Sequence, residues 1–423
     1  MRVLQAILRH LISIVKLEER RYCMATALNG LKVIDFCLYV AGPEAGALLG
    51  DMGADVIKIE QRQIGDPQRG VQTVIGMNQQ HSSGLNMGFA RMNRNKRGIA
   101  LDITKPEGKE IINRLIERSD VFLTNYRRLV LEKLQLTYEI LRQHNPRLVY
   151  AQATGYGLKG PDSDLPVLDG VGLTRSGMAM TCGEEGGPPT WLVPGMSDIG
   201  VGVTLAFAIV SALLARERSG EGQMVTTSQL SAMLELQSWL LTVGIFSGKE
   251  SPRVNVARSP LWNFYKCADG LWGFLAVVRD NEWPVLCEAI GLPQMASDPR
   301  FDSMSKRAEH GWELVPILNE TFSTKTFHEW DEIFRRADLI FGRVNRLFDL
   351  LRDPQIEANQ YIYDYDHPVL GKIKWLGFPF EMLGTPLVMT KDAPELGQHT
   401  EEILLEAGYT WPDIARLQDL EVI

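Results

Sequence analysis

The sequence predicts an α/β protein with a parallel sheet in a large domain and a second, smaller α+β domain. Over the first 230 residues, short apolar runs that fit buried strands alternate with helical stretches, which is the pattern of strand–helix–strand units. From about Ser251 the pattern changes to a hairpin followed by helices. A chain of 423 residues is long enough for about two such domains.

The first strand–helix–strand unit is expected over residues 31–60. Leu31–Phe36 fits a strand, a helix follows to about Met52 with Pro43 suited to its first helical position, and 55–60 fits the second strand. Further along, the same reasoning gives three more strands of the sheet, one helix between them and a sixth strand after a long apolar stretch. These segments are 99–101, 106–119, 121–123, 148–153 and 224–227.

A long apolar run, Ile199–Ala215, follows Asp198. Its length is at the lower limit for a membrane span, but it contains Gly200 and Gly202 and ends in charged residues. We therefore expect a helix in a domain core, followed by another helix over 229–246, and no membrane partner.

The smaller domain is expected to begin with a hairpin. Phe264–Cys267 and Trp272–Leu275 fit two strands joined at Asp269-Gly270, and helices are expected at 282–290 and 305–336. Short strands and a terminal helix are expected over 370–423. The predicted division is an N-terminal extension (1–27), a large domain (28–230 with 360–423), a small domain (255–345) and linkers (231–254 and 346–359).

Composition excludes several classes of protein. A net charge of −8 does not favour nucleic acid as a partner. The five cysteines are scattered without a C-x-x-C pair, and the seven histidines lack metal-ligand spacing, so we expect a reducing, cytoplasmic location and no metal. The basic, amphipathic residues 1–23 fit a transit peptide less well than a stretch upstream of the true start at Met24.

The first helix carries glycines that do not fit a nicotinamide cofactor. Gly42, Gly46 and Gly50 are spaced G-x-x-x-G-x-x-x-G, whereas the dinucleotide fingerprint is G-x-G-x-x-G. A dehydrogenase is therefore disfavoured. The helix start still offers free N–H groups to an anionic ligand. The basic segments 93–97 and 127–133 fit either a solvated face or a site for phosphates.

Asp198 lies directly before the apolar run, in Pro194-Gly195-Met196-Ser197-Asp198. A polar residue in such a position is usually an N-cap, which is worth about 1 kcal/mol. The helix N-terminus also favours an ionised carboxylate, which nucleophilic catalysis by aspartate requires. Backbone N–H groups near Gly195–Gly200 are candidates for holding an oxyanion. Spacing alone leaves the cap and the nucleophile open.

An ordered series of segments resembles the class III CoA-transferases, which include formyl-CoA transferase and carnitine CoA-transferase. The series runs from residue 28 to about 410. Its members are Leu28–Phe36, Ala41-Gly42-Pro43, Gly53–Glu60, Asn95-Lys96-Arg97, Asn145–Leu148, Gly155-Tyr156-Gly157, Gly220–Gln223, Tyr265–Gly270 and Leu396–Thr400.

The resemblance implies a CoA-transferase that uses a CoA thioester as substrate and needs no tightly bound cofactor. Asp198 matches the nucleophile that forms an anhydride and then a CoA thioester. The family fold implies a Rossmann-like large domain built from both chain ends, in an interlocked homodimer whose chains thread through one another. The positions that match CoA-contacting residues are Val40, Ala41, Gln61, Arg62, Arg97, Leu101, Asn125, Tyr126, Arg127 and Lys133.

Two departures keep alternatives open. Residues 256–262 lack the run of glycines that closes over the aspartate in formyl-CoA transferase, so oxalate or formate is not a secure substrate, and Arg258 is a candidate contact for an acceptor carboxylate. The aromatic residues of the small domain point to a larger or apolar acid. An α-methylacyl-CoA racemase is an alternative, although Leu168 stands where racemases carry histidine and we expect Asp169 to point away. A non-catalytic CoA-binding subunit is the other.

Overall fold

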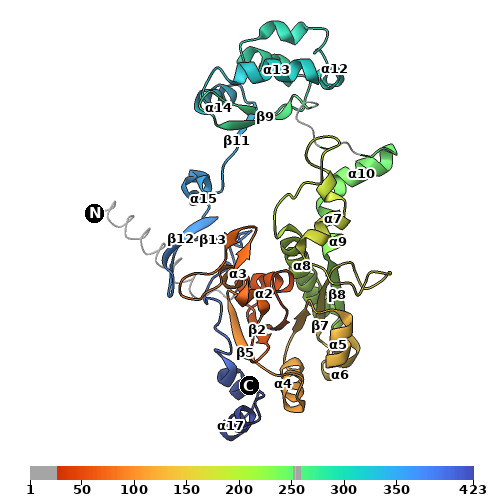
Figure 1. Ribbon diagram of the computed structural model, residues 1–423, viewed down its shortest axis with the longest axis vertical. Helices are drawn as coiled ribbons and strands as arrows, with labels where there is room; N and C mark the ends of the chain where they lie inside the picture. Colours follow the sequence, from red (N-terminus) through yellow and green to blue (C-terminus); the bar gives the residue numbers. More distant parts are fainter. Residues whose placement is uncertain (1–25, 251–252, 254–258) are drawn as a thin grey trace, which may run out of the picture.

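The computed structural model describes residues 26–250, 253 and 259–423, and it contains a six-stranded parallel sheet in the order β5-β2-β1-β6-β7-β8 (Figure 1). The expectations for residues 1–25 and for Arg258 lie outside the described residues. The mixed α/β fold predicted from the sequence is confirmed. The strands are β1 (Lys32–Phe36), β2 (Asp55–Glu60), β5 (Lys96–Ala100), β6 (Val121–Thr124), β7 (Val149–Thr154) and β8 (Met224–Ser228).

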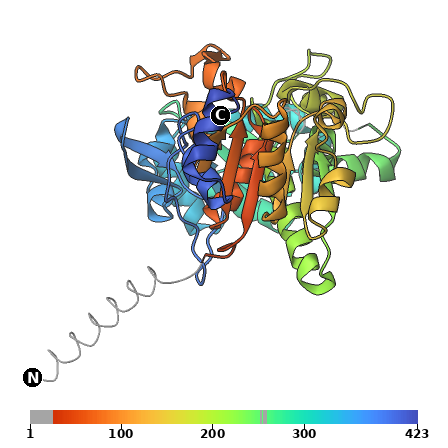
Figure 2. The same ribbon diagram turned by 90° about the horizontal axis from the view of Figure 1, so that it is seen from below.

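Helices cover both faces of this sheet (Figure 2). On one face the core joins α2 (Ala41–Asp51), α7 (Asp169–Arg175), α8 (Met196–Ser219) and α9 (Gln229–Leu236). On the other it joins α4 (Pro106–Glu117), α5 (Arg128–Leu134), α6 (Tyr138–His144), α16 (Thr400–Glu406) and α17 (Trp411–Asp419). The C-terminal segment thus returns to the first sheet, where the Asp102 N–H donates to the Val422 carbonyl at 2.8 Å.

Strand β5 begins three residues before the predicted segment, because its first residues are charged and yet buried. Lys96 Nζ donates to Asp35 at 2.6 Å, and Arg94 pairs with Asp51 at 2.5 Å. A buried charge is tolerated where it is paired and hydrogen-bonded. The basic segment 93–97 is therefore an internal ion-pair network, and the interpretation as a solvated face is wrong.

The three glycines of α2 allow close packing against residues in or next to β1 and β5. A side chain at Gly42 would meet Cys37 Sγ at 2.4 Å, one at Gly46 would meet Asp35 Oδ2 at 2.8 Å, and one at Gly50 would meet Asn95 Cβ at 2.9 Å. The glycine spacing thus serves the contact between helix and sheet. The helix begins at Ala41, so Pro43 is its third residue and not its first.

Helix α8 is packed along one side only. It is long and apolar enough to cross a membrane by length and composition, as are α9 and α10 (Ser238–Ser247) if taken as one bent pair. Val201, Leu205 and Ile209 are buried against the sheet and α2, whereas Phe207 is 73% exposed. The expectation of a core helix therefore holds for one side of α8. The predicted helix 229–246 is broken at Gln237, with an angle of 72° between α9 and α10.

A separate core lies within residues 261–341, at the end of the molecule far from the first sheet (Figure 1). The hairpin of β9 (Trp262–Lys266) and β10 (Trp272–Ala276) is present, and an unexpected third strand, β11 (Ile340–Arg343), pairs with β10. The predicted helix 305–336 is three helices. The helices of this unit are α11 (Glu282–Ala289), α12 (Met304–Glu309), α13 (Gly311–Phe322) and α14 (Phe327–Arg336).

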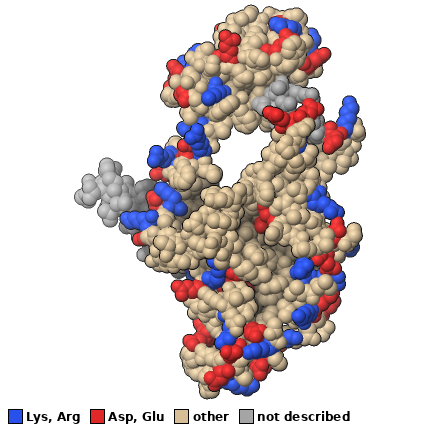
Figure 3. Space-filling view, in the orientation of Figure 1, with Lys and Arg blue, Asp and Glu red and all other residues tan. Residues whose placement is uncertain are grey.

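The three-stranded sheet packs its helices against one face and leaves the other open. Tyr265 is fully buried, whereas Trp262, Phe264 and Trp272 are each about half exposed. The space-filling view shows an opening between this unit and the rest of the chain (Figure 3). The remaining elements are β3 (Thr73–Val74), β4 (Met77–Asn78), α3 (Met87–Met92), α15 (Pro354–Ala358) and the pair β12 (Ile362–His367) and β13 (Gly371–Leu376).

Candidate active site

A crevice for a ligand is expected between the carboxyl ends of β1 and β6. The chain continues from β1 to β2 on one side and crosses to β6 on the other, so this is the topological switch point at which α/β sheets bind ligands. Val40 and Ala41 follow β1, and residues 125–127 follow β6. The Asn125 side chain joins the two loops, accepting from the Leu38 N–H at 2.9 Å and donating to the Leu38 carbonyl at 2.7 Å.

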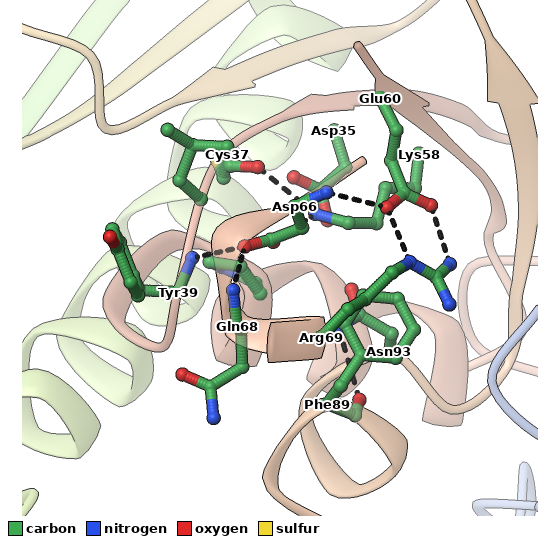
Figure 4. A network of polar contacts seen from close by, with 12 residues as sticks. Asp35, Cys37, Tyr39, Lys58, Glu60, Asp66, Gln68, Arg69, Phe89 and Asn93 are labelled. Atoms are coloured by element: carbon green, nitrogen blue, oxygen red, sulfur yellow. Dashed lines mark hydrogen bonds and ion pairs between the residues drawn. The ribbon is translucent and has the colours of Figure 1, made fainter. Parts of the chain in front are cut away.

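A buried ion pair between Lys58 and Asp66 holds the loop after β1 in place (Figure 4). Lys58 Nζ donates to the Cys37 carbonyl at 2.9 Å and pairs with Asp66 at 2.9 Å. Asp66 Oδ1 accepts from the Tyr39 N–H at 3.0 Å. Burial would lower the pKa of Lys58, but the carboxylates of Asp66 and Asp35 outweigh it and hold the pKa above its ordinary value. Lys58 is therefore a permanent cation beneath the loop.

Tyr39 shows why the loop needs this support. Its φ is 61°, a left-handed conformation that is uncommon for residues other than glycine. Such a conformation persists only where the surroundings enforce it. Asp66 is itself held by Glu60, which accepts from the Asp66 N–H at 2.9 Å and binds Arg69 through both carboxylate oxygens. The network thus presents the start of α2 in one conformation.

Asp198 lies in the first turn of α8 and is not its N-cap. The helix begins at Met196 after Gly195, and the carboxylate that serves the helix start comes from Asp169 in α7. Asp169 accepts from the N–H groups of Gly195 at 2.9 Å, Ser197 at 2.8 Å and Asp198 at 3.3 Å. The expectations that Asp198 caps the helix and that Asp169 points away from the site are both wrong.

The pKa of the Asp198 carboxyl lies well above the ordinary value of an aspartate and about one unit below neutral pH. Burial first, and the neighbouring Asp169 second, raise its pKa from 3.8 to about 6. A hydrogen bond from Gln229 Nε2 to Asp198 Oδ1, at 2.6 Å, acts in the opposite direction. The helix start does not offset these effects, because its N–H groups are directed to Asp169. Asp198 is thus ionised at pH 7 but weakly stabilised in that form.

Packing between α8 and α2 brings Asp198 close to the start of α2. A side chain at Gly202 would meet Glu44 Cβ at 2.9 Å and the Ala41 carbonyl at 3.1 Å, so the two helices touch there. Asp198 is one turn earlier on α8, which is about 6 Å along the axis. The candidate nucleophile and the loop after β1 therefore belong to one site.

The other predicted CoA contacts are placed unevenly. Arg127 and Lys133 are exposed beyond β6, and Tyr126 stacks on Phe36 with ring centroids 4.4 Å apart. Leu101 is buried as a whole residue and its N–H donates to the Glu60 carbonyl at 2.9 Å, so neither its side chain nor its N–H is free for a ligand. Farther out, Gln61 accepts from the N–H groups of residues 63 and 64, and Arg62 Nε donates to the Ile423 carbonyl at 2.8 Å.

Arg97 differs from the other predicted CoA contacts because its guanidinium is already paired with carboxylates. It is held by Asp55 at 2.6 Å, Glu402 at 2.6 Å and Glu406 at 2.9 Å. Three carboxylates already satisfy its guanidinium, and they would repel a phosphate. We therefore exclude Arg97 from the candidate CoA site.

Reasoning from one sequence did not find Gln229, Lys58 or Asp66, and it gave Asp169 no role. The sequence could have pointed to them only through their position near the carboxyl ends of strands, where ligands bind in α/β sheets. Lys58 lies in β2 and Gln229 directly follows β8. In the described part of the chain, no group of three or more His, Cys, Asp or Glu side chains could hold a metal ion.

Comparison with known proteins identifies the family. Residues 28–400 match the model of CoA-transferase family III. The chain is 32% identical to (R)-2-hydroxy-4-methylpentanoate CoA-transferase of Clostridioides difficile, over 94% of this chain and 99% of that protein. It is 33% identical to cinnamoyl-CoA:phenyllactate CoA-transferase of Clostridium sporogenes, over 92% and 95%. The crystal structure of a CAIB/BAIF family protein from Brucella suis superposes with a TM-score of 0.78 at 28% identity, covering 90% of this chain and all of that one.

Proposed function

The chain belongs to CoA-transferase family III and is an enzyme that moves coenzyme A from an acyl-CoA to a carboxylic acid; we propose that it does so through covalent intermediates on Asp198. The observation that carries this proposal is the state of that carboxylate. It is partly buried and ionised at neutral pH, it is held through one oxygen by Gln229, and it lies one helical turn from the point where α8 meets the start of α2.

The reaction begins when Asp198 Oδ2 attacks the thioester carbon of the donor. The C–S bond breaks, CoA leaves as a thiolate, and a mixed anhydride joins Asp198 to the donor acyl group. The thiolate then attacks Asp198 Cγ, the donor acid leaves as a carboxylate, and Asp198 carries CoA as a thioester. The acceptor carboxylate reverses these steps. Splitting one difficult exchange into easier ones is the advantage of covalent catalysis.

CoA is proposed to lie across the switch point. The N–H groups at the start of α2 have no side-chain cap within the described residues, and the loop that precedes them is fixed by Lys58 and Asp66. Arg127 and Lys133 are exposed cations on the β6 side and are the candidates for the CoA phosphates. The relatives are named for acids that include 2-hydroxy-4-methylpentanoate and phenyllactate, so we propose an acid with an apolar side chain as acceptor.

The test is to trap the intermediate. The protein is incubated with a donor acyl-CoA and hydroxylamine, and the modified residue is located by mass spectrometry. We expect a hydroxamate at Asp198 and complete loss of transfer in Asp198→Ala. Asp162→Ala, which removes a surface carboxylate paired with Arg175, is the matched control and should transfer normally. Near-normal turnover by Asp198→Ala, or modification at another residue, would contradict the proposal.

A homodimer is proposed as the active assembly. Helix α10 has no buried side chain in the single chain, and Trp239 and Phe246 on it are 83% and 87% exposed. Phe207 adds to this surface from the unpacked side of α8. Exposed apolar surface of this extent is typical of a protein–protein interface. Sedimentation should give a dimer that persists on dilution, and a folded monomer would contradict it.

A further inference from the structure

Gln229 is aimed at Asp198 by the local structure of two elements. It follows β8 directly and is the first residue of α9, whose start is fixed by a capping box between Ser228 and Ser231. Its side chain is buried, and Nε2 lies 2.6 Å from Asp198 Oδ1. Space for it exists because α7 has glycine at 172, where a side chain would meet Gln229 Cβ at 2.6 Å.

The direction of this hydrogen bond follows from the charge. An ionised carboxylate can only accept, so the Gln229 amide must present its NH2 group to Asp198. Gln229 Oε1 is buried and has no hydrogen-bond partner within the described part of the chain. A buried amide with one half unsatisfied destabilises the folded state, which indicates a role other than stability.

The backbone around Asp198 cannot take this role. The N–H groups of Gly195, Ser197 and Asp198 are donated to Asp169, and the Ile199 N–H is donated to the Gly195 carbonyl at 2.9 Å. The sequence-based expectation that backbone groups near Gly195–Gly200 hold an oxyanion is therefore wrong for the groups nearest the carboxylate. Among the described residues, Gln229 supplies the one donor on that carboxylate.

We propose that Gln229 is a catalytic residue that stabilises the oxyanion formed on the Asp198 carboxyl group itself. This inference rests on the proposed covalent function. In the anhydride, Oδ2 bridges to the donor acyl group and Oδ1 becomes a carbonyl oxygen. When the CoA thiolate attacks Cγ, the S–C bond forms and the electron pair of the C=O bond moves to Oδ1, where Nε2 donates to it. Collapse restores the carbonyl and expels the donor acid as a carboxylate, so no proton or external reagent is required.

The same contact serves the second half of the reaction. The acceptor carboxylate attacks Cγ of the aspartyl-CoA thioester, negative charge again gathers on Oδ1, and the C–S bond breaks. Because Gln229 acts on Cγ and not on the substrate acyl carbon, its contribution is independent of the acid transferred. Loss of Gln229 should therefore slow every donor and acceptor pair by a similar factor.

The experiment compares Gln229→Leu with Gln237→Leu. Gln237 is the matched control, because its amide donates to the Ser176 carbonyl at 2.7 Å and makes no contact with Asp198. We expect kcat to fall by a factor of about 10²–10³ in Gln229→Leu, as for loss of one oxyanion donor, with the KM for acyl-CoA changed less than threefold. The acid limb of the pH profile should move up, because the hydrogen bond that lowers the Asp198 pKa is gone.

A second variant covers a failure of Gln229→Leu to fold. Gln229→Glu keeps the shape of the side chain and, at pH 8, replaces the donor by a carboxylate, so kcat should fall at least as far. A kcat within tenfold of wild type in either folded variant would overturn the inference. Hydroxylamine trapping separates the two proposals, because modification of Asp198 together with full activity of Gln229→Leu refutes the role of Gln229 alone. Absence of modification in the wild type refutes the covalent function.

Discussion

Replacing Asp198 by asparagine should stabilise the protein at neutral pH while abolishing transfer. Asparagine keeps an oxygen that accepts from Gln229 Nε2, and it removes the charge that burial and Asp169 disfavour. The pKa of Asp198 is about 6 in the folded chain against an ordinary 3.8. At 1.36 kcal/mol per pKa unit, ionisation of this group costs the folded state roughly 3 kcal/mol.

The pH dependence has a definite sign. Because the pKa is higher in the folded state, the unfolded chain binds fewer protons between about pH 4 and pH 6, and the free energy of unfolding falls as the pH rises. The wild type therefore loses stability across this window, and the loss is complete above pH 7. Asp198→Asn has no such proton to lose, so its advantage should be absent near pH 4 and reach roughly 3 kcal/mol at pH 7–8.

Urea unfolding of both proteins at pH 4, 5, 6, 7 and 8 measures this difference directly. Asp162→Asn, at a surface ion pair, is the control and should show no comparable pH-dependent gain. A difference between Asp198→Asn and wild type that is constant with pH, or that grows as the pH falls, would refute the assignment of a raised pKa to Asp198.

Three further predictions follow from the same geometry. The transfer rate should fall as the pH is lowered through about 6, where the Asp198 carboxylate becomes protonated, and a profile flat from pH 5 to 8 would exclude Asp198 as the ionised nucleophile. Asp66→Asn should destabilise the fold by about 3 kcal/mol, since Lys58 loses its buried partner, and should raise the KM for acyl-CoA; an unchanged KM would separate the loop from CoA binding. Gly172→Ala should lower both kcat and stability, by about 1–3 kcal/mol for the latter, because its Cβ meets Gln229 at 2.6 Å; Gly342→Ala, which enters open space, is the control to be measured with it.

Most strands of the sheet could be predicted because each contains adjacent apolar residues. β1, β2, β6 and β7 fit this description although β1 and β2 also carry buried charges, and the structure has them within one residue of the expected bounds. The start of β5 was not predicted, because it carries Lys96 and Arg97. These charged side chains can be buried only because they pair with carboxylates, one of which lies 309 residues away in the chain. The pattern of apolar residues in a sequence predicts the apolar part of a core but not its buried ion pairs.

Only those residues of the site that match the motifs of the family could be predicted. Asp198 and the loops after β1 and β6 were found by resemblance, whereas Asp169 and Gln229 owe their importance to contacts across 29 and 31 residues. The expected N-cap failed for the same reason. A single sequence shows that some side chain will meet the N–H groups at the start of α8, but only the fold shows that it comes from α7.

The start of α8 is capped by Asp169 and not by Asp198, which explains how an aspartate at a helix start can act as a nucleophile. Had Asp198 capped α8, the N–H groups would have stabilised its charge and lowered its reactivity toward a thioester. Asp169 accepts from those N–H groups instead and places a repulsive charge beside Asp198. Together with burial this raises the pKa of Asp198 to about 6, and the hydrogen bond from Gln229 to Oδ1 limits the rise. The carboxylate is thus ionised at neutral pH and poorly stabilised by its surroundings. It gains stabilisation when it becomes the neutral carbonyl of an anhydride or thioester. Gln229, the one donor to it among the described residues, is placed to stabilise the negative charge that forms on Oδ1 at each exchange.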